Sequence, residues 1–386
     1  MTTTTENGAP PVRTDVPRSE RPDRPNRPRP LRRLLRWWPA MLLVVLVTAP
    51  YSTLPLPGLL DGPLGSPGSL QLIALCLVFG ALATGYDLLL GRTGLLSFGH
   101  ALYFATGSYA TDLIMLRLGL PFAEAALLGL LSGALLAVLL GSVSLRVSGI
   151  GFSMVTLAFA QAGSILVTGD PGGVTGGEEG LSAPAGRLPA GLVGIANTAD
   201  LYWVALAYLV LTLLVVHWAV RSATGRVWEG IRENERRVEV LGLRPYGFKL
   251  VAFVLAGVLA ALGGIVHLLL TGGATPQSTT SDFTLSLLVM VVLGGSGSRW
   301  GPLVGGVLYT WADHRLGTLA GSDAVAGLPT VLRVPLSQPL FLLGVLFIAS
   351  VFLLPGGVAR LPQRIREHRS GRSAARRRRP SGSEEG

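Results

Sequence analysis

The chain has 386 residues, of which 49% are hydrophobic and only 14% are charged. Because soluble domains carry about 25% charged residues, this composition excludes an ordinary soluble domain and indicates a multispanning membrane protein. The net charge of +10 does not predict nucleic-acid binding, because most basic residues lie in two tails and one central loop, as membrane orientation requires. The single cysteine, Cys76, excludes an intrachain disulfide, and no cysteine-based metal site is visible.

The predicted fold is an all-α polytopic membrane protein with about 10 (8–10) transmembrane helices. Residues 1–37 are rich in Arg and Pro and are predicted to be disordered. The apolar, membrane-spanning region covers 38–357, and a second basic tail, also predicted to be disordered, covers 358–386. The candidate spans lie at about 38–56, 70–90, 95–118, 122–145, 150–168, 201–220, 249–270, 283–295, 302–318 and 336–354.

Three of these spans need separate interpretation. The first is interpreted as an uncleaved helix, because no small-residue cleavage site follows its apolar run. The eighth is too short to cross a bilayer at 1.5 Å per residue, so we expect flanking residues to extend it, or a broken or re-entrant segment. The third is rich in Gly, Ser and Thr and can also be irregular.

Basic residues predict the orientation of the chain. With ten crossings both termini fall on one side, and nearly all of the 32 Lys and Arg residues fall there with them. The exceptions are Arg117, Arg187, Arg315 and Arg333. The positive-inside rule therefore places both termini in the cytoplasm of a multi-pass cell-membrane protein. Two long outer loops are expected at 169–200 and 319–335, and the first is expected to be irregular.

A charged island between two apolar spans, Gly225–Leu250, predicts an amphipathic helix at about 224–242. At 100° per residue, Val227, Ile231, Asn234, Val238 and Leu241 form one narrow stripe. Thr224 is the expected N-cap, and Gly242 with Pro245 the expected stop. Glu229 precedes Arg232, and Glu233 precedes Arg236 and Arg237, at spacings that allow ion pairs along a helix. A mixed-sign helix suits a protein partner, but a solvated loop or a helix lying on lipid also fits the composition.

Six motifs in order carry a family resemblance over about 70–357. They are "GRTGLLSFGHALYFATGSYA", "VSGIGFSMVTLAFAQ", "TGGEEGL", the island segment "GIRENE" with Leu241-Gly242, "VMVVLGGSGSRWGPLVGG" and "FLLPGG". On these motifs the chain resembles the LivM-type permeases of branched-chain amino acid ABC importers, a family that also includes urea permeases.

The resemblance implies a function for the charged island. In such permeases a cytoplasmic helix between spans docks into a groove of the ATP-binding subunit and transmits its closure. The coupling residues implied here are Ile231, Arg232, Glu233, Asn234, Glu235, Leu241 and Gly242. Implied partners are two ATP-binding subunits, a second homologous permease subunit, an extracytoplasmic binding protein and membrane lipid, with no nucleic acid, cofactor or metal.

The expected function is translocation of branched-chain amino acids, with no catalytic residues in this chain. It has no Gly-x-x-x-x-Gly-Lys-Ser/Thr phosphate loop, so ATP hydrolysis is expected from partner subunits. Some positions differ from the usual pattern, among them Asp87 where Asn is common and Gln161 where an acid is frequent. Urea or short amides are therefore the alternative cargo. A membrane-embedded enzyme is a further alternative, which would predict clustered acids or histidines at span ends.

Two Gly-interrupted segments supply candidate residues for a translocation path. The candidates are Ser97, Gly99, His100, Gly107, Thr156, Gly294, Gly295 and Gly297. Broken segments in transporters can mark a substrate path, but close helix packing explains glycines equally well. For His100 the alternative is a neutral ring hydrogen-bonded to a backbone carbonyl. Asp87 is expected to pair with Arg92 as a brace.

The external motif supplies candidates for contact with a binding protein. Gly176, Gly177 and Glu178 lie in the "TGGEEGL" segment of the first long outer loop. Its acids, Glu178 and Glu179, can meet a binding protein or can be ordinary solvated charges, and the sequence leaves both open.

Overall fold

The computed structural model of the chain describes residues 41–55, 62–192, 197–321, 338–353 and 356–357. The chain divides into two compact units at Thr48, and the described part of the first, 41–48, is helical. Everything below concerns the second unit, from Ala49 onward. The two predicted tails lie outside the described residues, as do residues 322–335 of the second outer loop.

Helices make up most of the described residues of the second unit. They are α2 (Pro67–Asp87), η2 (Leu88–Thr93), α3 (His100–Leu113), η3 (Ile114–Leu118), α4 (Phe122–Ser144), α5 (Ile150–Thr168), α6 (Thr198–Arg221), α7 (Ala223–Val240), α8 (Pro245–Thr271), α9 (Ser281–Gly294), α10 (Gly301–Ala320) and α13 (Pro339–Leu353). Short 3-10 turns lie at η1 (Ala49–Tyr51), η4 (Ala185–Arg187), η5 (Ala190–Leu192) and η7 (Pro276–Thr279). Two short strands, β1 (Leu181–Ser182) and β2 (Gly273–Ala274), pair antiparallel.

The predicted spans correspond to these helices with small shifts at their ends. Among the described residues, five helices are long and apolar enough to cross a membrane, and they begin at Pro67, Phe122, Ile150, Thr198 and Pro245. The helix at Met41–Tyr51 and the 14-residue α9 are shorter apolar helices. At 1.5 Å per residue α9 is about 21 Å long, which confirms that the eighth predicted span is too short to cross alone.

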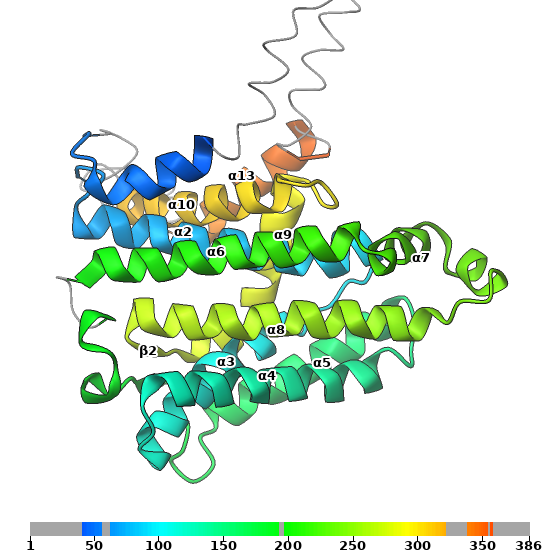
Figure 1. Cartoon of the computed structure of the whole chain (residues 1–386), viewed down its shortest axis with the longest axis horizontal. Helices are drawn as coiled ribbons and strands as arrows, with labels where there is room; N and C mark the ends of the chain where they lie inside the picture. Colours follow the sequence, from blue (N-terminus) through cyan, green and yellow to red (C-terminus); the bar gives the residue numbers. More distant parts are fainter. Residues whose placement is uncertain (1–40, 56–61, 193–196, 322–337, 354–355, 358–386) are drawn as a thin grey trace, which may run out of the picture. The chain divides into compact units, whose positions relative to one another are not determined.

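The two ends of the bundle carry different elements. In Figure 1, α2, α6, α8 and α4 run alongside one another, with α7 at one end and β2 at the other. Contacts agree with this arrangement: the Gln71 side-chain amide donates to the Leu270 carbonyl near one end, and the Tyr246 hydroxyl donates to the Ser142 carbonyl near the other. We call these the β end and the α7 end. Within the predicted irregular loop, β1 gives the β end a regular element that the sequence analysis missed.

Small residues let the central helices approach closely. Helix α8 packs against α3, α4 and α2, and a Cβ built on Gly107 in α3 would lie 2.0 Å from the Ala261 carbonyl oxygen in α8. No side chain fits at that distance, so glycine is required there. Aromatic side chains fill the rest of this core, including Phe104, Tyr103 and Phe253.

Candidate functional site

Helix α7 begins and ends at residues typical of helix termini. The sequence analysis predicted its end correctly but not its N-cap. Its N-cap is Ser222, whose hydroxyl accepts the Gly225 N–H, and not Thr224. The following turn holds Gly242 at φ +83°, and Pro245 begins α8, as expected from the sequence. Left-handed backbone of this kind favours glycine after a helix.

The helix is not continuous. Asn234 has φ −163° and ψ 104°, outside helical values, and its side-chain oxygen accepts the Arg237 N–H. Asn234 therefore caps the second helical segment of α7 and does not lie in a continuous apolar stripe. The prediction of an unbroken amphipathic helix was wrong. Asn stabilises such a break because its short side chain bonds the backbone ahead of it. The bundle buries Ile231 and Val238 but leaves Asn234 and Leu241 exposed.

Trp228 anchors the first half of α7. Its side chain is buried, and its indole N–H donates to the Phe248 carbonyl oxygen in α8 at 2.7 Å. The sequence analysis did not single out Trp228, which falls outside the predicted stripe. A large aromatic residue with one polar group in a charged segment was the available signal, because such a residue seeks both burial and a hydrogen-bond acceptor.

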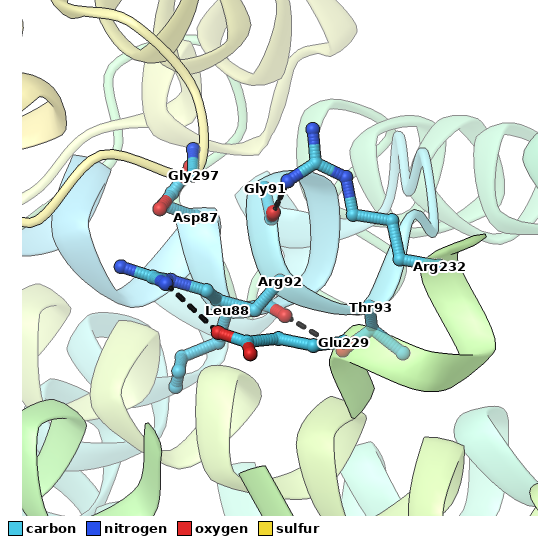
Figure 2. Close-up of polar contacts among 8 residues, drawn as sticks. All are labelled: Asp87, Leu88, Gly91, Arg92, Thr93, Glu229, Arg232 and Gly297. Atoms are coloured by element: carbon cyan, nitrogen blue, oxygen red, sulfur yellow. Dashed lines mark hydrogen bonds and ion pairs between the residues drawn. The ribbon is translucent and has the colours of Figure 1, made fainter. Parts of the chain in front are cut away.

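Arg232 joins α7 to η2, which continues directly from α2. Its guanidinium donates to the Gly91 carbonyl oxygen (Figure 2). The residue next to the Arg232 side chain is Gly94. It has φ +78°, and a Cβ on it would lie 3.3 Å from Arg232 Cγ. The conformation and the space beside the arginine both favour glycine there.

The same place receives the loop after α9. The Gly297 N–H donates to Asp87 Oδ1 at 2.8 Å, and Figure 2 shows Asp87 and Gly297 beside Gly91. A Cβ on Gly91 would lie 2.3 Å from the Gly297 nitrogen, so the two backbones touch. We call Asp87, Gly91, Arg232 and Gly297 the junction, because they connect α2, α7 and the α9–α10 loop.

Two ion pairs flank the junction. Arg92 and Glu229 lie 3.3 Å apart (Figure 2), and the Lys249 ammonium group contacts the Glu235 carboxylate. The predicted brace between Asp87 and Arg92 was therefore wrong, since Asp87 bonds Gly297 and Arg92 pairs with α7. The predicted partnership of Glu229 with Arg232 is also absent from the described contacts, because both side chains bind residues of η2 instead.

The exposed part of α7 remains available to another molecule. Glu233, Asn234, Leu241 and Gly242 are exposed, as are Arg236, Arg237 and Glu239. Val240 is 86% exposed and Leu241 is 74% exposed. Two large apolar side chains beside mixed charges at the tip of a protruding helix are typical of a protein-contact surface.

The predicted path residues before α3 form one hydrogen-bonded turn. Thr156 Oγ1 accepts the Phe98 N–H at 3.0 Å, and Ser97 Oγ accepts the Gly99 N–H at 3.3 Å. The Ser97 carbonyl oxygen accepts the Tyr86 hydroxyl at 2.8 Å. Ser97, Gly99 and Thr156 are therefore brought together, as non-helical backbone within the bundle requires.

His100 lies in the same region, and its environment differs from that of a histidine bonded to a backbone carbonyl. Its ring is fully buried and makes edge contacts with the Tyr86 and Tyr103 rings. Among the described residues neither ring nitrogen has a hydrogen-bond partner, so the expected bond to a backbone carbonyl is not present.

The remaining path glycines separate into two groups. Gly107 lies in the α3–α8 contact, and Gly294 lies against α10, where a Cβ would meet the Gly301 carbonyl oxygen at 1.9 Å. These two contacts match the packing explanation. Gly295 and Gly297 have positive φ values of 105° and 72° in the loop after α9, and Gly297 belongs to the junction.

The external candidates lie in a compact turn at the β end. Gly176 and Gly177 have positive φ values, and Glu178 is exposed. Asp170 Oδ1 accepts the Thr175 N–H at 2.6 Å and the Thr175 hydroxyl at 2.9 Å. These bonds stabilise the charged carboxylate and hold the pKa of Asp170 below its ordinary value. Within the described residues no cluster of metal-ligand side chains is present.

The family follows from sequence comparison. The sequence model described as "branched-chain amino acid transport system / permease component" matches residues 69–351, most of the chain. The chain belongs to this family. No solved structure matches it.

Individual relatives of the permease carry related names. This chain is 31% identical over 265 residues to the high-affinity branched-chain amino acid transport system permease protein LivM of Salmonella typhimurium. The alignment covers 63% of this chain and 62% of the relative. This chain is 28% identical to the probable LivM of Methanocaldococcus jannaschii, over 74% of this chain and 83% of that one. The autoinducer 2 import system permease protein LsrC of Escherichia coli is 30% identical over 45% of this chain and 48% of its own length.

The alignments cover only part of the first two relatives. The permease spans about three fifths of the length of the LivM proteins of Salmonella and Escherichia coli that it matches. The comparisons identify a membrane permease component, and the apolar helices agree with a multi-pass membrane protein.

Proposed function

We propose that this chain is the membrane-spanning subunit of an ATP-driven importer of branched-chain amino acids. An extracytoplasmic binding protein delivers the substrate, a second homologous permease subunit completes the pore, and two ATP-binding subunits supply the energy. Support comes from the family and from the names of relatives that cover much of the chain. The distribution of basic residues along the sequence supports a cytoplasmic position for both termini.

The observation that carries the proposal is the double character of α7. Its base is fixed to the bundle by Trp228, Arg232 and Glu229, while Glu233 and Leu241 are exposed beyond it. A lever needs both features, because one part must contact a moving partner and the other must be attached to what it moves. We assign α7 as the coupling helix, with Ile231 to Glu235, Leu241 and Gly242 as its working residues.

The junction determines which helices move with α7. Arg232 contacts Gly91 in η2, which continues from α2, and Asp87 in α2 holds the loop that follows α9. A displacement of α7 on closure of the ATP-binding subunits therefore reaches α2 and α9 together. We assign Ser97, Gly99, His100 and Thr156, beside the start of α9, to the region that this movement opens. Gly176, Gly177 and Glu178 at the β end are assigned to the binding-protein contact.

Uptake by the complete transporter tests the proposal. Proteoliposomes containing all subunits and binding protein would be assayed for ATP-dependent uptake of radiolabelled leucine and urea. The test variant carries Glu233→Ala and Gly242→Ala, which alter the exposed α7 region, and the control carries Glu124→Ala, an exposed acid in the first turn of α4. We expect leucine uptake that the double variant abolishes and the control retains.

Other outcomes separate the components of the proposal. Urea uptake without leucine uptake would keep the importer and change its cargo. Full leucine uptake by an assembled double variant would contradict the role of α7. No ATP-dependent uptake of either compound by the wild-type transporter would overturn the proposed function.

A further inference from the structure

A group of exposed polar side chains lies where α9 begins. Gln161 of α5, Gln277 of η7 and Asp282 of α9 are all exposed, and Gln161 Nε2 donates to Ser281 Oγ at 3.0 Å. In the part of the chain that the structure describes, the Asp282 carboxylate has no hydrogen bond or ion pair. We call Gln161, Gln277 and Asp282 the polar strip.

The polar strip lies deep along the membrane-spanning helices. Helix α5 has 19 residues, so its length of about 28 Å matches a hydrocarbon core of about 30 Å. Gln161 precedes Thr168, the last residue of α5, by seven residues, which places it about 10 Å inside that end. The Gln161–Ser281 bond and a 3.2 Å bond between Thr279 and Ser164 hold the start of α9 at this depth.

The direction of α9 keeps its first turn inside the bundle region. In Figure 1, α9 lies at a steep angle to α6 and α8. Thr284, one turn after Thr280, accepts the Ala101 N–H of α3 at 3.0 Å, so the start of α9 meets the start of α3. Asp282 is therefore not at a membrane surface, where an exposed carboxylate would need no explanation.

Lipid cannot cover this strip. A charged side chain in the hydrocarbon region is costly and usually faces water or a charged partner. By contrast, the exposed side chains of α4 at similar depth are apolar, including Leu128 and Leu131. The polar strip thus contrasts with the apolar surface that α4 presents at similar depth.

We propose that the polar strip lines the substrate path between this chain and the second permease subunit, and that the Asp282 carboxylate binds the substrate's ammonium group. This inference rests on the proposed function and adds a specificity residue to it. Leu285 lies one turn beyond Asp282 and is 43% exposed, so an apolar surface adjoins the carboxylate. The Gln161 amide has a second N–H that can donate to a substrate carboxylate. These groups match an aliphatic α-amino acid and not an uncharged amide.

Chemical labelling tests the position of Asp282 without requiring transport. Asp282→Cys and Leu128→Cys would each be made in a Cys76→Ala background, in the complete transporter in proteoliposomes. A small, charged methanethiosulfonate reagent reacts with thiolates in water, so we expect Cys at position 282 to react at least about tenfold faster than at 128. Equal, slow labelling of both would overturn the proposal, even if the transporter imports leucine normally.

Transport measurements test the role of the carboxylate. Leucine uptake and ATP hydrolysis would be measured with saturating loaded binding protein for wild type, Asp282→Asn and Asp282→Glu. We expect Asp282→Asn to lower uptake at least about tenfold, equivalent to 1.4 kcal/mol, with ATP hydrolysis retained and uptake partly restored in Asp282→Glu.

Two results would contradict this role. Unchanged uptake by Asp282→Asn would show that the carboxylate does not bind the substrate. Failure of Asp282→Asn to assemble with the second permease subunit would show instead that Asp282 pairs with a basic residue of that subunit. If wild-type protein imports no leucine, the proposed function fails, while the labelling contrast still decides whether Asp282 faces water.

Discussion

Arg232 has an unusual position for an arginine of a charged helix. Its guanidinium leaves the α7 surface and contacts the backbone of Gly91, beside the Asp87–Gly297 bond. Backbone carbonyls accept well from a planar guanidinium with several donors. The side chain therefore connects elements instead of only solvating the helix.

Arg232→Ala should separate ATP hydrolysis from transport. Without the guanidinium, α7 retains its Trp228 anchor and its Glu229–Arg92 ion pair but loses its bond to the Gly91 carbonyl in η2. We expect uptake per ATP hydrolysed to fall about tenfold or more, in the range of typical coupling energies. Arg226→Ala, an exposed arginine on the same helix, is the matched control. Equal coupling in both variants would contradict the role of Arg232.

Trp228→Phe should destabilise the protein through one hydrogen bond. Phenylalanine keeps most of the buried ring but leaves the Phe248 carbonyl without its indole donor. An unsatisfied buried acceptor costs about 1–3 kcal/mol, so the unfolding temperature in detergent should fall. Trp218, which is 76% exposed, supplies the control: Trp218→Phe should have little effect. A similar melting temperature for both variants would argue against the anchor.

At the scale of elements, α3 and α8 approach each other closely. Gly107 meets the Ala261 backbone, and a Cβ on Gly264 of α8 would lie 1.9 Å from the Phe104 carbonyl oxygen. The two helices therefore touch backbone to backbone in both directions. Such contacts are typical of membrane bundles, where packing replaces the hydrophobic effect between helices.

Gly107→Ala should disturb this contact even though alanine favours helices. The added methyl group must displace α8, at a cost of about 1–3 kcal/mol for overpacking. Gly247→Ala is the control, since a Cβ there meets nothing within 4 Å and should stabilise α8 by up to about 1 kcal/mol. Thermal unfolding in detergent measures both changes. Opposite signs are expected, and equal signs would contradict the packing account.

The turn after α5 should be sensitive to acid. The pKa of Asp170 is lowered by its bonds from Thr175, so its contribution is present above the ordinary Asp pKa of about 3.9. The contribution is lost as pH falls through the lowered value. We expect slow hydrogen exchange at the Thr175 N–H near neutral pH and faster exchange in Asp170→Asn. Unchanged protection in that variant would show that charge does not hold the turn.

At the scale of the whole molecule, the two ends of the bundle should face opposite sides of the membrane. Leu241→Cys at the α7 end and Glu178→Cys at the β end both place a thiol on an exposed position. In right-side-out vesicles, an impermeant thiol reagent should label only position 178, and in inverted vesicles only position 241. Labelling of both from one side would contradict the proposed topology.

The sequence by itself determined the membrane class, the family, the helical spans and the charged segment at α7. These follow from composition, apolar length and ordered motifs, which are properties of the chain before it folds. Gly242 and the short α9 were also correctly predicted, because a left-handed turn and a limited helix length depend on local residues.

Only the tertiary structure decided which polar groups meet. The partner of Asp87 is the Gly297 N–H, 210 residues away, and Glu229 meets Arg92 across 137 residues. Spacing along the sequence favoured Arg92 as the partner of Asp87 and Arg232 as the partner of Glu229. Helix packing instead brought groups that are distant in sequence into contact with these two acids. The break at Asn234 has the same cause in part, because the bundle holds α7 on both sides of it through Ile231 and Val238. Periodicity describes an isolated helix, whereas burial against neighbouring helices decides where that helix bends and which side chains it shares.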